Sequence, residues 1–165
     1  MITISEAVNS DIKTIQDIVY KTWPITYGEI LSEEQLQYML DLFYSDEALM
    51  DQFEKNEQLF YLIIEGESTL GFIGIEHNYQ NKNCTKIHKI YLLPETQGKG
   101  IGKITIETIG KLALENNSTS LLLNVNRFNK ALHFYEKVGF KIINEINIEI
   151  GNGYLMEDFV MEKKL

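Results

Sequence analysis

The feature that most constrains the fold is a glycine-rich turn between an expected strand and an expected helix. The strand covers about residues 86–92, and the apolar positions of residues 100–116 lie on one face of a helix. Three alternating glycines, Gly98, Gly100 and Gly102, connect the two. Glycine lets the backbone turn several N–H groups inward, and the start of a helix adds a partial positive charge. The segment predicts a phosphate-binding site or, more simply, a tight turn.

The residues before this turn predict a strand, three helices and an antiparallel hairpin. The first helix is expected to end at Trp23, because the residue before a proline is disfavoured in helical backbone. Ser32 and Gln35 form a capping-box pattern that begins the second helix. The expected ranges are 1–6 for the strand, 12–23, 33–43 and 46–55 for the helices, and 59–64 and 70–75 for the hairpin.

The residues after the turn predict a crossover unit and a final hairpin. Leu121 to Val125 form a buried strand, which a strand–helix–strand crossover places parallel to its predecessor. A helix follows near residues 131–138 and is closed by Gly139. Two last strands flank the turn at residues 151–153.

The composition indicates one globular domain over residues 1–165. The single cysteine, Cys84, excludes an internal disulfide framework and a thiolate-rich zinc site, so we expect a reducing compartment and no metal. The sequence contains neither a signal-peptide pattern nor a window of about 18 apolar residues that could span a membrane. We therefore expect a soluble, cytoplasmic protein.

The charge is unevenly distributed along the chain. The net charge of −9 argues against nucleic-acid and anionic-membrane partners, which attract basic surfaces. Residues 1–76 carry 3 basic and 15 acidic side chains, whereas residues 77–103 carry 5 basic and 1 acidic. The acidic half predicts either attraction of a cationic ligand or a solvated surface that keeps the protein soluble.

Two well-known phosphate-binding motifs do not match the glycine turn. The nucleoside-triphosphate loop needs a glycine five residues before Gly102, where Gln97 stands, and a hydroxyl residue where Ile104 follows Lys103. The dinucleotide fingerprint that begins at Gly98 has Lys103 in place of its third glycine. A nucleotide-binding module of either kind is therefore disfavoured.

Residues 97–102, Gln-Gly-Lys-Gly-Ile-Gly, match the pattern Gln/Arg-x-x-Gly-x-Gly/Ala, and residues 134–140 read Phe-Tyr-Glu-Lys-Val-Gly-Phe. These segments resemble the two hallmarks of the GCN5-related N-acetyltransferase (GNAT) superfamily, and the order of expected elements agrees over essentially the whole chain. The resemblance implies an α/β (α+β) fold with a twisted, mixed and mostly antiparallel sheet of about six to seven strands. It also implies helices on both faces and a splayed parallel strand pair.

The same resemblance implies acetyl-CoA as co-substrate. Its pyrophosphate would be held by backbone amides of Gly98, Lys99, Gly100, Ile101, Gly102 and Lys103, with Gln97 shaping the loop. Its pantetheine would pair with main chain near Leu92. Many relatives carry a CoA-facing asparagine where this chain has Phe128, so we assign that role to Asn129, with Asn126 as the alternative.

The resemblance also suggests catalytic residues. Tyr135 matches the position of a phenol that protonates the departing CoA sulfur, and otherwise it is a core aromatic at helical spacing. An amine acceptor must lose a proton before it attacks. Glu76, just after an apolar strand, is the carboxylate best placed by sequence to take that proton, unless it is merely solvated, and His77 and His88 are lesser candidates.

Acceptor specificity is expected from the segment before the sheet. Residues 22–29 resemble those of relatives of bacterial polyamine acetyltransferases, and Trp23 and Tyr27 either line an acceptor pocket or fix the loop to the core. The predicted function is direct acetyl transfer to a primary amine of a small molecule or peptide, through a ternary complex. The alternative is a non-catalytic acyl-CoA sensor. Homodimers are common in the superfamily, but no residue here identifies an interface.

Overall fold

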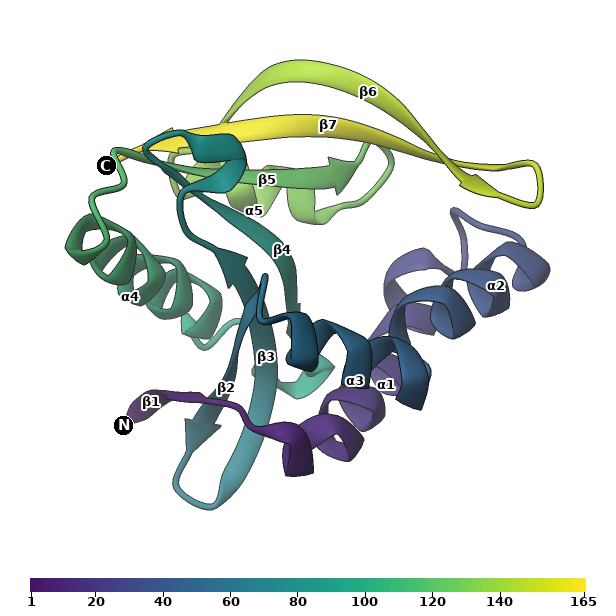
Figure 1. Ribbon diagram of the computed structural model, residues 1–165, viewed down its shortest axis with the longest axis horizontal. Helices are drawn as coiled ribbons and strands as arrows, with labels where there is room; N and C mark the ends of the chain where they lie inside the picture. Colours follow the sequence, from purple (N-terminus) through teal and green to yellow (C-terminus); the bar gives the residue numbers. More distant parts are fainter.

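A seven-stranded sheet runs through the computed structural model, which describes residues 1–165 (Figure 1). The strands are β1 (Ile2–Glu6), β2 (Leu59–Glu65), β3 (Ser68–Glu76), β4 (Cys84–Leu92), β5 (Ser120–Asn126), β6 (Lys141–Gly151) and β7 (Tyr154–Lys164). Their order is β1-β2-β3-β4-β5-β7-β6, and only β4 and β5 are parallel. The expected mixed, mostly antiparallel sheet is confirmed.

Helices cover both faces of the sheet, as expected (Figure 1). They are α1 (Ile12–Tyr27), α2 (Glu33–Tyr44), α3 (Asp46–Lys55), α4 (Ile101–Glu115) and α5 (Ala131–Lys137), with short 3₁₀ turns at Asn9–Asp11, Tyr79–Asn81 and Pro94–Thr96. The predicted cap of α2 is present, since Ser32 Oγ accepts a hydrogen bond from the Gln35 N–H. None of these helices combines the length and apolar character needed to cross a bilayer.

Helix α1 does not end at Trp23, so that boundary was wrong. The helix continues through Pro24 to Tyr27, and the Gly28 N–H donates to the Pro24 carbonyl at 3.0 Å. Pro24 removes the hydrogen bond that the Tyr20 carbonyl would accept, but Tyr20 lies on the exposed side of the helix, where water can replace it. Edge-to-face packing of Trp23 on Tyr27, with ring centroids 5.0 Å apart, stabilises the extra turn.

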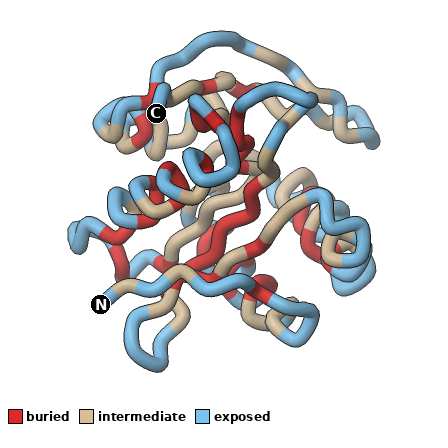
Figure 2. The backbone as a smooth tube through the Cα atoms, turned by 60° about the vertical axis from the view of Figure 1, so that its left-hand side comes forward, coloured by how far each residue is buried: buried red, intermediate tan, exposed pale blue.

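Two main hydrophobic clusters hold the layers together, one on each face of the sheet. Helices α1–α3 bury the first cluster, which includes Trp23, Tyr44 and Phe72. Helices α4 and α5 bury the second, which includes Ile109 and Phe140. Figure 2 shows the buried residues concentrated along the central strands and on the inner sides of the helices.

An extra residue in β4 separates that strand from β5. Gly74 and Ile75 on β3 pair with Lys89 and Ile87 on β4, which leaves His88 as a β-bulge. Pairing between β4 and β5 begins at Cys84 and ends at Ile87. Beyond that point the two strands diverge, which confirms the expected splayed parallel pair.

Helix α4 allows a matched test of the second cluster. Replacing fully buried Ile109 by alanine is expected to lower the free energy of unfolding by about 2–5 kcal/mol, because it removes apolar contacts and leaves a cavity. The same change at Ile104, which is 40% exposed on this helix, should cost less than about 1 kcal/mol. Urea denaturation of both variants measures the difference, and equal losses would contradict the assigned packing.

Candidate functional site

The divergence of β4 from β5 opens a cavity of about 1350 Å³. Its walls come from α1, β4, the glycine turn, the first turn of α4, β5 and α5. The candidate residues that line it are Tyr27, His88, Leu92, Gln97, Gly98, Gly100, Ile101, Gly102, Lys103, Asn129 and Tyr135. The candidates that do not line it are Trp23, Glu76, His77, Lys99 and Asn126.

The glycine turn presents a row of free backbone donors to this cavity. Gly98 and Gly100 have φ angles of 78° and 73°, and a Cβ at either position would meet no atom within 4 Å. Their backbone conformation, rather than lack of space, therefore calls for glycine. The N–H groups of residues 98, 100, 101, 102 and 103 donate no hydrogen bond within the protein. Together with the start of α4, they form a site suited to an anion.

Gly102 brings the two sequence hallmarks into contact. A Cβ at this position would lie 2.9 Å from Cζ of Phe134, so glycine allows the phenylalanine ring of α5 to rest on the first turn of α4. The next residue of α5, Tyr135, thereby reaches the same cavity as the glycine turn.

The end of β4 offers an open hydrogen-bonding edge. The Leu93 N–H donates to the Leu70 carbonyl of β3 at 2.8 Å. Because backbone groups alternate along a strand, the N–H and C=O of Leu92 point to the opposite side, where β5 has already diverged. An extended ligand can add to this edge as a strand would.

Tyr135 combines burial with a free hydroxyl. The residue is 8% exposed, and its ring packs edge-to-face between Phe134 and Phe140. Its hydroxyl forms no hydrogen bond within the protein and lies at the cavity wall. Burial raises the pKa of the Tyr135 phenol, so the group keeps its proton at neutral pH and can donate it.

Trp23 and Tyr27 have different environments. Tyr27 lines the cavity, and its hydroxyl lies 3.2 Å from that of Tyr91. Burial raises the pKa of both phenols. Trp23 is 3% exposed and lies behind them in the core, 5.8 Å from Tyr91 between ring centroids. Trp23 therefore supports the cavity wall that Tyr27 forms.

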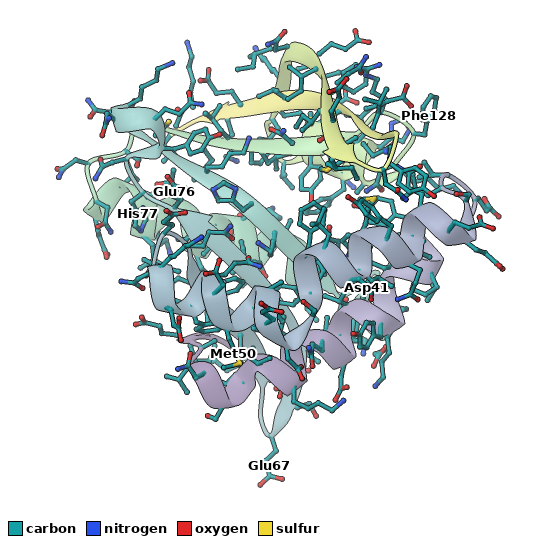
Figure 3. The ribbon with its side chains drawn as sticks, turned by 45° about the vertical axis from the view of Figure 1, so that its right-hand side comes forward. Asp41, Met50, Glu67, Glu76, His77 and Phe128 are labelled. Atoms are coloured by element: carbon teal, nitrogen blue, oxygen red, sulfur yellow. The ribbon has the colours of Figure 1, made fainter.

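The strand bulge places His88 at the cavity and Glu76 behind it. His88 Nε2 lies 2.9 Å from Glu76 Oε1, and both side chains are largely shielded from solvent. Burial lowers the pKa of His88 and the hydrogen bond to Glu76 opposes this, so the imidazole is neutral at pH 7. His77, beside Glu76 at the end of β3 (Figure 3), pairs instead with Thr85 Oγ1 at 2.8 Å.

Asn126 and Asn129, the two asparagines before α5, each accept a hydrogen bond from a backbone N–H two residues further along the chain. Asn129 Oδ1 accepts the Ala131 N–H at 2.9 Å, which leaves the Asn129 amide nitrogen without a protein partner at the cavity wall. Asn126 Oδ1 accepts the Phe128 N–H, and Phe128 itself projects outward at the rim (Figure 3). Of these two asparagines, Asn129 is the one that lines the larger cavity.

A second, smaller cavity of about 100 Å³ adjoins the first on the α1–α2 side of the sheet. Both cavities are lined by Tyr27, His88, Tyr91 and Asn124. Asp158 of β7 lies in the wall of the smaller one and is 4% exposed. The sequence analysis did not identify this residue. Asp158 shares one face of its strand with the apolar residues Met156 and Val160, and an acidic side chain in such a position indicates a buried carboxyl group.

Helix α2 and the β6–β7 hairpin close the smaller cavity together. The Tyr38 hydroxyl donates to the Ile150 carbonyl at 2.6 Å, and Gln35 Nε2 donates to the Leu155 carbonyl at 3.0 Å. A Cβ at Gly151 would lie 2.7 Å from the Tyr38 hydroxyl, so glycine makes this approach possible. The helix and the hairpin are therefore tied at two points.

Comparison with known sequences gives a consistent result. Residues 13–140 match the pattern of the acetyltransferase (GNAT) family. A spermidine N(1)-acetyltransferase from Thermoplasma acidophilum is 31% identical over 159 residues, covering 93% of this chain and 91% of the relative. An uncharacterized N-acetyltransferase of Bacillus subtilis, YuaI, is 27% identical over 159 residues, covering 95% and 90%.

Solved structures agree with the sequence matches. The PaiA N-acetyltransferase from Thermoplasma acidophilum, crystallised with coenzyme A, has a TM-score of 0.81 at 29% identity and covers 100% of this chain and 99% of its own. A GCN5-related N-acetyltransferase from Rhodopseudomonas palustris also scores 0.81, at 18% identity with 99% and 95% coverage, which shows a shared fold.

Proposed function

The chain belongs to the acetyltransferase (GNAT) family and is an N-acetyltransferase, and from this premise we propose that it transfers acetyl from acetyl-CoA directly to a primary amine. The row of free N–H groups at residues 98–103, facing a cavity that also contains the Tyr135 hydroxyl, carries this proposal. The acceptor is an amine on a small molecule or a peptide, and the relative named as a spermidine acetyltransferase favours a small molecule.

The cavity walls suit the parts of acetyl-CoA. The free N–H groups of the glycine turn would hold the pyrophosphate, and Gln97 and Lys103 flank them. Lys99 is exposed and adds positive charge outside the cavity. The open edge at Leu92 would pair with pantetheine, and the free amide of Asn129 lies on the same wall. Acetyl-CoA supplies the thioester.

Both substrates can be present together, which supports a ternary complex. The larger cavity holds the CoA-binding groups, and the smaller one joins it on the other side of β4. Cys84, the only cysteine, lies outside both cavities, and burial raises the pKa of its thiol. Direct transfer therefore needs no acyl-cysteine.

Two polar groups in the cavity between β4 and β5, His88 and Tyr135, carry the proposed proton transfers. His88, neutral at pH 7, takes the proton of the acceptor amine, and Glu76 holds its imidazole in position. A C–N bond forms at the acetyl carbon while the C–S bond breaks, and Tyr135 gives its proton to the departing sulfur. Glu76 thus contributes through His88.

The glycine turn is tested by two alanine variants, each at an uncrowded glycine with a positive φ angle. Acetyl-CoA at about 100 times its dissociation constant should add about 2.7 kcal/mol to the stability of the unmodified protein. Gly100→Ala should lose most of this thermal shift, since the left-handed backbone that directs the N–H groups is disfavoured. Gly66→Ala, at a hairpin with a φ angle of 62°, should keep the shift. No shift in the unmodified protein would refute the proposed cofactor.

Tyr135→Phe should reduce kcat for acetyl transfer by about 10²-fold or more, because the variant lacks the hydroxyl that protonates the thiolate. Acetyl-CoA binding, measured by calorimetry, should stay within about threefold, since the aromatic packing remains. Tyr20→Phe on the exposed side of α1 serves as the control. Unchanged turnover would exclude the general-acid role, and binding without transfer to any amine would indicate a sensor.

The His88–Glu76 pair predicts a specific pH dependence. Activity should fall as pH drops through the lowered pKa of His88, because the protonated imidazole cannot accept a proton. Glu76→Gln weakens the hydrogen bond that raises this pKa, so the acid limb should move to lower pH. His88→Gln should abolish the limb, whereas His77→Gln should leave it in place. Profiles of the rate against pH from 5 to 9, measured with one amine, test this. If Glu76→Gln did not shift the pH at which the rate falls on the acid side, the pairing would be contradicted.

A further inference from the structure

Asp158 is a buried carboxylate without a cationic partner. It is 4% exposed, and no Lys, Arg or His nitrogen lies within 4.0 Å of its oxygens. The two cations whose charges act on Asp158 are engaged elsewhere, since Lys86 donates to Asn124 and Arg127 pairs with Glu145 at 3.2 Å. A buried charge without a partner is costly, so the position is suited to a cation brought from outside.

The cavity beside Asp158 has the lining that an aliphatic ammonium ion needs. Tyr27 and Tyr91 present aromatic rings, and Leu31, Met39 and Met156 provide apolar surface for methylene groups. Burial raises the pKa of the Asp158 carboxyl, and the neighbouring Asn124 together with the charges of Lys86 and Arg127 opposes this rise. The space, about 100 Å³, suits a small charged group rather than a bulky one.

This cavity is connected to the reaction site through shared residues. His88, which takes the acceptor proton in the proposed function, lines both cavities, as do Tyr27 and Tyr91. Glu29 lies on the wall of the larger cavity and belongs to the strongly acidic first part of the chain. A cation is therefore attracted to the entrance and meets Asp158 beyond the reacting amine.

We propose that Asp158 and the adjoining cavity bind the second ammonium group of a diamine or polyamine acceptor. This inference rests on the proposed acetyl transfer at His88 and names the acceptor class: a linear aliphatic amine with a positive charge at a distance from the amine that reacts. The methylene chain passes along the apolar lining between the two groups. Asp158 does not touch the reacting atoms and determines specificity.

The test compares acceptors of equal length that differ in the distal charge. Pentane-1,5-diamine and 5-aminopentan-1-ol share the reacting amine, so the ratio of their kcat/KM values reports the distal subsite. The unmodified protein should prefer the diamine by about 10- to 100-fold, the range of a charge-assisted hydrogen bond. A ratio near one in the unmodified protein would overturn the proposal without any variant.

Substitution of Asp158 then tests whether this residue causes the preference for the diamine. Asp158→Asn keeps the shape and removes the charge, so the ratio should fall to about one, mainly through KM for the diamine. Glu157→Gln, the adjacent residue on the opposite face of β7, should retain the ratio. The acetyl-CoA thermal shift confirms that each variant is folded. A ratio that persists in Asp158→Asn would refute the subsite. Failure to acetylate either amine would also refute the subsite, and failure with every primary amine, peptides included, would refute the proposed function.

Discussion

The extra residue at His88 is the constraint on which the rest of the site depends. A regular β4 would continue to pair with β5, and the sheet would be closed where the cavity now lies. The bulge turns the strand, exposes the backbone of Leu92 and places an imidazole at the divergence. In the proposed function, the groups for acetyl-CoA lie on the α4–α5 side and those for the acceptor on the α1–α2 side, so this one irregular position would let the two substrates meet.

The contact between Gly102 and Phe134 gives this arrangement its rigidity. The two hallmark segments are far apart in sequence, yet the ring of one rests on the backbone of the other. Tyr135 follows directly in α5, so its position relative to the glycine turn depends on this contact. Burial between two aromatic rings then keeps the phenol protonated. The same packing therefore positions Tyr135 and maintains its protonation.

Most elements could be predicted from the sequence because their signals are local. The capping residue Ser32, the glycine turn and the apolar spacing of α4 each act within a few residues. The end of α1 could not be predicted in this way. Packing of Trp23 against distant aromatic rings compensates for the helix-breaking effect of Pro24. The pairing of Glu76 with His88, and the burial of Asp158, depend on the register of strands from both halves of the chain. Site residues of this kind are set by tertiary structure, which local patterns do not encode.

The two hydrogen bonds from α2 to the β6–β7 hairpin couple the positions of two elements that are far apart in the sequence. Tyr38 and Gln35 tie the helix to the backbone of the hairpin, so neither wall of the smaller cavity can shift alone. Because the acceptors are backbone carbonyls, another hairpin could keep the tie if it retained a glycine at position 151, whereas another helix would need both Tyr38 and Gln35. The helix and the hairpin therefore act as one mechanical unit in the wall of the smaller cavity.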